Sequence, residues 1–131
     1  MQLQRDTTVV VTDGEKLRLF RNTGTEADLA LTELPRPEVH GDAEESGHEQ
    51  HAGQDARDHQ EASFTAAVAR WLNHEVATGR INLLLVIAPP RALGQLRQHY
   101  AIAVKKRLVG ELAKEHAHDA VHVLEQVVTD A

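Results

Sequence analysis

The chain has 131 residues, a length typical of one domain with a normal hydrophobic core, and we expect residues 1–131 to form a single domain. With 41% hydrophobic and 26% charged residues, the composition is that of an ordinary globular protein. The chain contains no cysteine and only two Phe, one Trp and one Tyr. This composition excludes disulfides, thiolate metal sites, a cysteine nucleophile and the aromatic platforms of single-strand-binding proteins.

The net charge of −6 is distributed unevenly along the chain. Residues 26–62 carry eleven acids and two arginines, a balance of −9, whereas residues 80–114 carry seven basic residues and one acid, a balance of +6. Overall acidity argues against tight non-specific nucleic-acid binding and against DNA sequence recognition, but it leaves room for a local basic surface. No window reaches the roughly 18 apolar residues of a membrane span, and no leader pattern is visible. We therefore expect no membrane insertion and a cytoplasmic location.

The first third of the chain predicts three antiparallel strands. Residues 7–12 are β-branched and are followed by Asp13-Gly14, a strong turn signal, and then by alternation over residues 16–20. Residues 28–34 predict a third strand, which the prolines at positions 35 and 37 end.

A different composition begins at residue 35. Residues 35–62 are acidic, rich in histidine and poor in large apolar side chains, so we expect a mobile loop there. From Asp58 to about Thr78 the apolar residues recur every three or four positions, which predicts a helix. Asp58 or Ser63 could cap this helix, and Gly79 occupies the position of a left-handed C-cap.

The stretch from residue 81 to residue 87 is almost continuously apolar and predicts a strand that is buried on both faces. Pro89-Pro90 ends this strand, and the spacing of the leucines afterwards predicts an amphipathic helix. Arg91 therefore stands at the carboxyl end of a buried strand, where α/β sheets tend to bind ligands. The alternative is that the turn is merely stiff and that Arg91 is solvated.

The last third predicts a helical continuation over residues 101–108, a short strand over residues 109–112, and a final helix capped by Asp119. The resulting order, βββαβαβα, predicts an α/β sandwich of two or three layers with a mixed five-stranded sheet.

Nine histidines raise the question of a metal site. His48 and His51 are three residues apart, and His118 and His122 are four apart on the predicted last helix. Histidine and carboxylate ligands suit zinc or nickel, but no established ligand spacing is present, so we expect neither a physiological metal nor a cofactor. Nucleotide-binding glycine loops and a serine elbow are also missing, and no enzyme class stands out.

Several motifs resemble the bacterial host-attachment protein family over nearly the whole chain. They are TTVVVTDGEKLRLF, HAGQDARDHQEASF, INLLLVIAPPRALGQLR and ELAKEHAH. The family is named for a requirement in attachment to host cells. It is also similar to the central domain of archaeal and eukaryotic peptide release factors, which implies a ribonuclease-H-like βββαβαβα core. In that domain a loop before the first helix carries a Gly-Gly-Gln tip.

The equivalent loop here reads Ala52-Gly53-Gln54, next to His51. The first glycine of the tip is replaced by alanine, and the flanks are acidic where a loop entering ribosomal RNA should be basic. Both departures argue against peptidyl-tRNA hydrolysis.

Three hypotheses follow for the function. The first is a non-enzymatic cytosolic binding or regulatory protein that acts indirectly in host attachment and binds an unknown protein partner. The second is a ribosome- or RNA-associated factor derived from the release-factor central domain. The third is a hydrolase, possibly metal-dependent, with Gln54 or a histidine pair at its site. The candidate binding residues are Arg91, Arg97, Lys105, Lys106 and Arg107, and the candidate loop residues are His51, Gly53 and Gln54.

Overall fold

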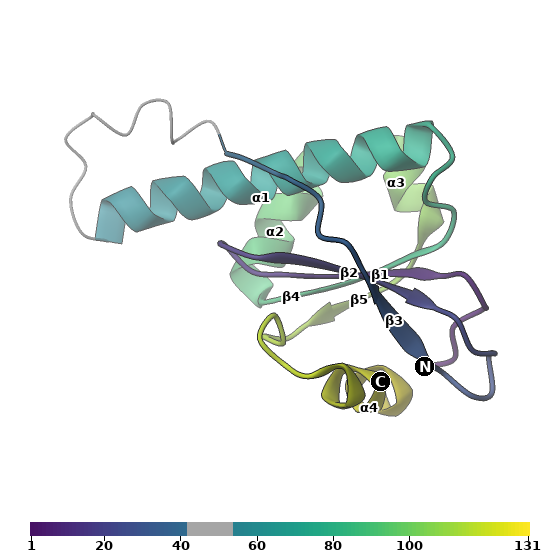
Figure 1. Cartoon of the computed structure of the whole chain (residues 1–131). Helices are drawn as coiled ribbons and strands as arrows, with labels where there is room; N and C mark the ends of the chain where they lie inside the picture. The colour runs from purple at the N-terminus through teal and green to yellow at the C-terminus, as the bar shows by residue number, and fades with distance from the viewer. Residues whose placement is uncertain (42–53) are drawn as a thin grey trace.

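The computed structural model describes residues 1–41 and 54–131, which form a mixed sheet with helices on both of its faces (Figure 1). The strands are β1 (Thr8–Thr12), β2 (Leu17–Asn22), β3 (Leu31–Leu34), β4 (Leu84–Ala88) and β5 (Leu108–Ala113). The helices are α1 (Gln54–Ala77), α2 (Pro90–His99), α3 (Ile102–Arg107) and α4 (Val121–Asp130). The α/β class is confirmed. None of these helices is long and apolar enough to cross a membrane.

The sheet has five strands in the order β3-β2-β1-β4-β5. The pairs β1–β2 and β2–β3 are antiparallel, and β1–β4 and β4–β5 are parallel. The predicted hairpin is confirmed, because Thr12 pairs with Leu17 across the turn that contains Asp13 and Gly14. The three strands β1, β4 and β5 therefore run in one direction and place their carboxyl ends at one edge of the molecule.

Two apolar layers enclose the two central strands. Alternate residues of β1 and β4, such as Val10 and Val86, pack toward α1, α2 and α3, with Leu72 among their neighbours. The intervening residues, such as Leu85, pack toward α4, with Leu124 among theirs. All five residues of β4 are buried, as the apolar run predicted. Full burial of one aliphatic side chain contributes about 1.5–3 kcal/mol, so these layers supply most of the driving force for folding.

Helix α1 begins at Gln54, four residues before the predicted start at Asp58, so residues 54–62 of the expected loop are helical. The segment is rich in Ala, Gln, Glu and Arg, which favour helix, and Asp55 lies in the first turn, where the helix dipole favours an acid. Asp58 and Ser63 lie inside the helix and do not cap its start. Gly79 follows the helix with φ of 78°, as predicted. Residues 42–53 lie outside the described residues, and the mobility of the loop stays a prediction.

The last helix also differs from the prediction. Its N-cap residue is Ala120, which makes no side-chain capping hydrogen bond. Asp119 instead bonds the Nδ1 atom of His116 through Oδ2, at 2.6 Å. The proposed cap at Asp119 was therefore wrong, because a local carboxylate–imidazole contact engages this side chain.

Candidate functional site

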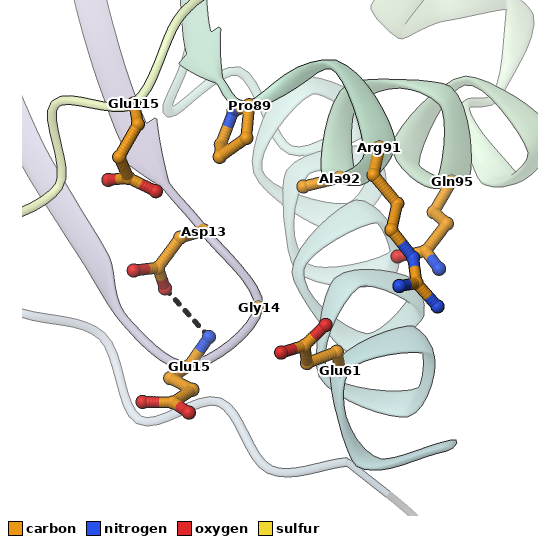
Figure 2. A pocket seen from close by; sticks show the side chains of 9 residues that line it. All are labelled: Asp13, Gly14, Glu15, Glu61, Pro89, Arg91, Ala92, Gln95 and Glu115. Carbon is orange, nitrogen blue, oxygen red and sulfur yellow. Dashed lines mark hydrogen bonds between the residues drawn. The ribbon is translucent and has the colours of Figure 1, made fainter. Parts of the chain in front are cut away.

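A depression of about 310 Å³ lies where the parallel strands end (Figure 2). Asp13 and Glu15 come from the turn after β1, Pro89 follows β4, and Glu115 follows β5. The full lining is Asp13, Gly14, Glu15, Glu61, Pro89, Arg91, Ala92, Gln95 and Glu115. This is the edge at which open α/β sheets usually bind ligands.

Arg91 lies on the rim of this depression, in the first turn of α2, as the sequence predicted for the end of a buried strand. Its Nη1 atom is 3.1 Å from the Oδ1 atom of Asp58 on α1, and its side chain is 57% exposed. An ion pair with this exposure stabilises the fold by less than about 1 kcal/mol. The contact orients Arg91 toward α1.

The depression is acidic, because its lining contains Asp13, Glu15, Glu61 and Glu115 and a single cation, Arg91. In Figure 2 the Oδ1 atom of Asp13 accepts a hydrogen bond from the backbone N–H of Glu15 at 2.7 Å. Glu115 accepts a hydrogen bond from the backbone N–H of Ala117 at 2.9 Å. Two of these carboxylates therefore hold local turns, and the charge balance disfavours an anionic ligand beside Arg91.

The predicted cations do not gather around Arg91. Arg97 lies in the last turn of α2 and pairs with Glu111 of β5 at 3.2 Å. Lys105, Lys106 and Arg107 form the last turn of α3, directly before β5, and we call them the α3 basic surface. Because β4 and β5 are parallel, this surface lies at the amino end of the sheet, about 13–17 Å along the strands from Arg91.

The side chains of the α3 basic surface are all exposed. Arg107 donates a hydrogen bond from Nη1 to the Oδ1 atom of Asn82 at 2.9 Å. Within residues 1–41 and 54–131, Lys105 and Lys106 form no ion pair. A cavity of about 460 Å³ lies beside them, lined by Val76, Ala77, Ala103, Lys106 and Arg107. Helix α1 ends at Ala77, and the partial negative charge of its last carbonyls favours cations at this place.

The candidate loop residues lie mostly outside the described residues, and the candidate histidines that are described do not come together. His51 and Gly53 lie outside the described residues, and Gln54 is known only as the first residue of α1. His118 precedes α4 and approaches the Oδ2 atom of Asp13 at 3.5 Å through Nε2, whereas His122 is exposed on α4. These two histidines therefore do not share a helix, and that prediction was wrong. In the described part of the chain, no group of three or more His, Asp or Glu side chains is arranged to hold a metal ion.

Sequence reasoning missed the acidic lining of the depression. Asp13 was interpreted only as a turn residue, and Glu61 and Glu115 were not considered. A signal was present for two of them, because Asp13 and Glu115 each follow a strand by one or two residues. Strands of a parallel set end at the same edge, so such residues meet in space.

The structure thus defines an α/β protein with a mixed five-stranded sheet, an acidic depression at one end and a basic surface at the other. A sequence model for bacterial archaeo-eukaryotic release factor family 12 matches residues 6–128. The chain belongs to this family, which confirms the similarity to release factors inferred from the motifs. A search of curated proteins found no match.

Proposed function

We propose that this protein is a non-enzymatic factor that associates with ribosomal or other structured RNA through the α3 basic surface. The observation that carries the proposal is the set of three consecutive exposed cations at the end of α3, two of which have no acidic partner among the described residues. Membership of a release-factor family points to RNA as the polyanion. The proposal places the protein in the cytoplasm, together with ribosomes.

The affinity expected from this surface is moderate and depends strongly on salt. Each phosphate that a lysine or arginine neutralises releases condensed counterions, with a slope of log K against log salt of about −0.7 to −0.9 per contact. Three contacts therefore correspond to a slope of about −2 to −3. The net charge of −6 opposes association at long range, so binding requires the basic end to face the RNA.

The non-enzymatic part of the proposal rests on the loop sequence. Ala52 replaces the first glycine of the release-factor tip, and the surrounding segment is acidic. A backbone that lacks this glycine loses access to the conformations that only glycine adopts readily. We therefore infer a binding role that is derived from a catalytic domain and retains its architecture.

Two finer predictions belong to the same proposal. The first is a ribonuclease-H-like core, which the element order supports: three antiparallel strands precede the alternating helices and parallel strands. The second is the host-attachment resemblance, which concerns a phenotype. A ribosome-associated factor would influence attachment only indirectly, through the synthesis of other proteins.

The test measures co-sedimentation with purified bacterial ribosomes and binding to bulk tRNA over a salt series. We expect the Lys105→Glu/Lys106→Glu variant to bind at least tenfold more weakly and to lower the salt slope by about 2. The matched control is Lys16→Glu/Lys114→Glu, which changes the net charge equally at the carboxyl end of the sheet and should bind as the wild type does.

Equal loss in both double variants would refute the α3 basic surface as the contact. Absence of any salt-dependent binding would refute the RNA association itself. Release of peptide from peptidyl-tRNA by the wild type, with loss of release in Gln54→Ala, would refute the non-enzymatic assignment. Nuclease treatment of a lysate pull-down separates partners held by RNA from direct protein partners.

A further inference from the structure

The two edge strands of the sheet, β3 and β5, differ in how far their outer backbone groups are protected from pairing with another strand. At the β3 edge, the backbone N–H of Leu31 donates to the Oε2 atom of Glu125 on α4 at 2.8 Å. Strand β3 has only four residues, and Pro35 and Pro37 follow it. A side-chain cap, a short strand and nearby prolines all prevent another strand from adding to an edge.

The β5 edge lacks these three protections, and its only irregular features are the charged Glu111 and a register shift beside Val109. Strand β5 has six residues, LVGELA, with one charged residue and no proline, and among the described strands it pairs with β4 alone. Within the described residues, no side chain donates to or accepts from its backbone. Val109 is 42% exposed, one of the few large apolar side chains with this exposure. The strand therefore presents free backbone groups and an apolar side chain together.

We propose that β5 is an interface at which a second copy of this chain adds its own β5 in the antiparallel direction, which joins the two five-stranded sheets into one. A two-fold axis near Glu111 makes the contact self-complementary, as closed dimers require. A register shift between β4 and β5 beside Val109 leaves Gly110–Ala113 as the regular part of the strand. We expect the new ladder to centre on this part.

Charge at the two ends of the sheet favours this direction, and the two Glu111 carboxylates that meet at the axis each keep the Arg97 of their own chain as an ion-pair partner. An antiparallel arrangement places the α3 basic surface of each copy at the carboxyl end of the partner's sheet. That end carries Asp13, Glu15 and Glu115, and Lys114 offsets only part of their charge. A parallel arrangement would instead bring the two basic surfaces together, so the antiparallel dimer is the one that charge supports.

The contact is small, because it consists of one strand and its flanks. Stable interfaces bury about 1,200–2,000 Å², and a single pair of edge strands falls below this range. We therefore expect a weak dimer with a dissociation constant on the order of 10–100 μM that weakens further as salt rises.

The first experiment is sedimentation velocity on the full chain over a concentration series that spans this constant. The weight-average mass should rise from the 14.5 kDa of one chain toward twice that value. Val109→Lys should abolish the rise, because a lysine on an edge strand opposes pairing while its charge stays in water. Val123→Lys on α4 is the matched control, since Val123 is 38% exposed, and it should dimerise as the wild type does.

A second measurement keeps the proposal open to refutation if Val109→Lys is poorly folded. The chain has no cysteine, so Glu111→Cys introduces a single thiol near the proposed axis. We expect rapid disulfide-linked dimer in oxidant for Glu111→Cys and slow collisional linkage for Val123→Cys.

A mass of 14.5 kDa at every concentration, or equal linkage in the two cysteine variants, would overturn the interface. Equal dimerisation of the two lysine variants would assign the contact to another surface. The proposed dimer places the α3 basic surface beside the partner's acidic end, so RNA and a second copy would compete for this surface. Val109→Lys keeps Lys105, Lys106 and Arg107, so this variant should bind RNA at least as well as the wild type does. A monomeric Val109→Lys that still binds RNA would show that the two activities are separate, and RNA binding by the wild type without any dimer at high concentration would overturn the dimer alone.

Discussion

Replacement of Arg18 by Met removes a guanidinium that connects two separate parts of the fold. Arg18 is 7% exposed on β2 and holds Glu33 of β3 by two hydrogen bonds of 3.1 and 2.9 Å. Its Nη1 atom also donates to the backbone carbonyls of Ala117 and Asp119, in the segment between β5 and α4. The guanidinium lies 5.0 Å from the centre of the Phe20 ring.

The loss of stability in Arg18→Met comes from the carboxylate of Glu33, which stays in place without its ion-pair partner. Loss of one partner of a buried ion pair costs about 3–5 kcal/mol. Met retains the packing of the aliphatic stem, and the stranded carboxylate of Glu33 is 32% exposed, so water recovers part of the loss. We therefore expect Arg18→Met to lower the free energy of unfolding by about 3 kcal/mol, a large part of a typical total of about 5–15 kcal/mol. The control Arg21→Met, on the same strand, should cost less than about 0.5 kcal/mol.

The dependence on pH gives an independent readout. The hydrogen bond from Arg18 holds the pKa of Glu33 below its ordinary value of 4.5. A carboxyl group with a lowered pKa in the folded state stabilises the fold above its unfolded pKa, and this contribution is lost as pH falls through the folded value. Glu33→Gln should therefore cost about 1–2 kcal/mol at neutral pH and progressively less below about pH 4.5.

The assay is urea unfolding followed by far-ultraviolet circular dichroism, at neutral pH and at about pH 3.5. A cost below about 1 kcal/mol for Arg18→Met would refute the reasoning from burial. An equal cost of Glu33→Gln at both pH values would show that the ionised form of Glu33 contributes nothing to stability.

Three further predictions concern single positions, each measured by urea unfolding. Gly79→Ala should lower the free energy of unfolding by about 1 kcal/mol, since φ is 78° at this position. Gly94→Ala should raise it by about 0.5–1 kcal/mol, because a Cβ there meets open space inside a helix. A change of the same sign in both variants would contradict the explanation from backbone conformation. Leu85→Ala should cost about 3–4 kcal/mol, because Leu85 is fully buried between β4 and α4, and a loss below about 1.5 kcal/mol would contradict close packing there. Arg91→Ala should lower stability by less than about 1 kcal/mol, and a larger loss would mean that its pair with Asp58 is more than a surface contact.

The sequence predicted the sheet well because its central strands are defined locally. The hairpin around Asp13-Gly14 and the apolar run before Pro89 are confirmed as β1, β2 and β4. The start of β4 was predicted too early, at Ile81, because a strand extends only as far as a neighbouring strand offers backbone hydrogen-bond partners. Strand β1 begins at Thr8, opposite Leu84, so residues 81–83 have no partner strand for regular pairing.

The end of the sheet at which a charged residue lies was harder to predict. Arg91 and the α3 basic surface are close in sequence, yet α2 and α3 carry the chain back along the sheet and separate them. The break at Tyr100, whose backbone is extended, divides what periodicity suggested was a continuous helix. Only the three-dimensional path shows that Arg91 shares its depression with carboxylates and not with the other predicted cations.

Among the described residues, the carboxylates at the carboxyl ends of the parallel strands and the α3 basic surface at their amino ends form an electric dipole along the strands. A polyanion repels a body of net charge −6 on average, but its field also exerts a torque on that dipole and rotates the positive pole forward. Encounters are thereby selected by orientation before any atoms touch, and an isotropic protein with the same net charge would lack this bias.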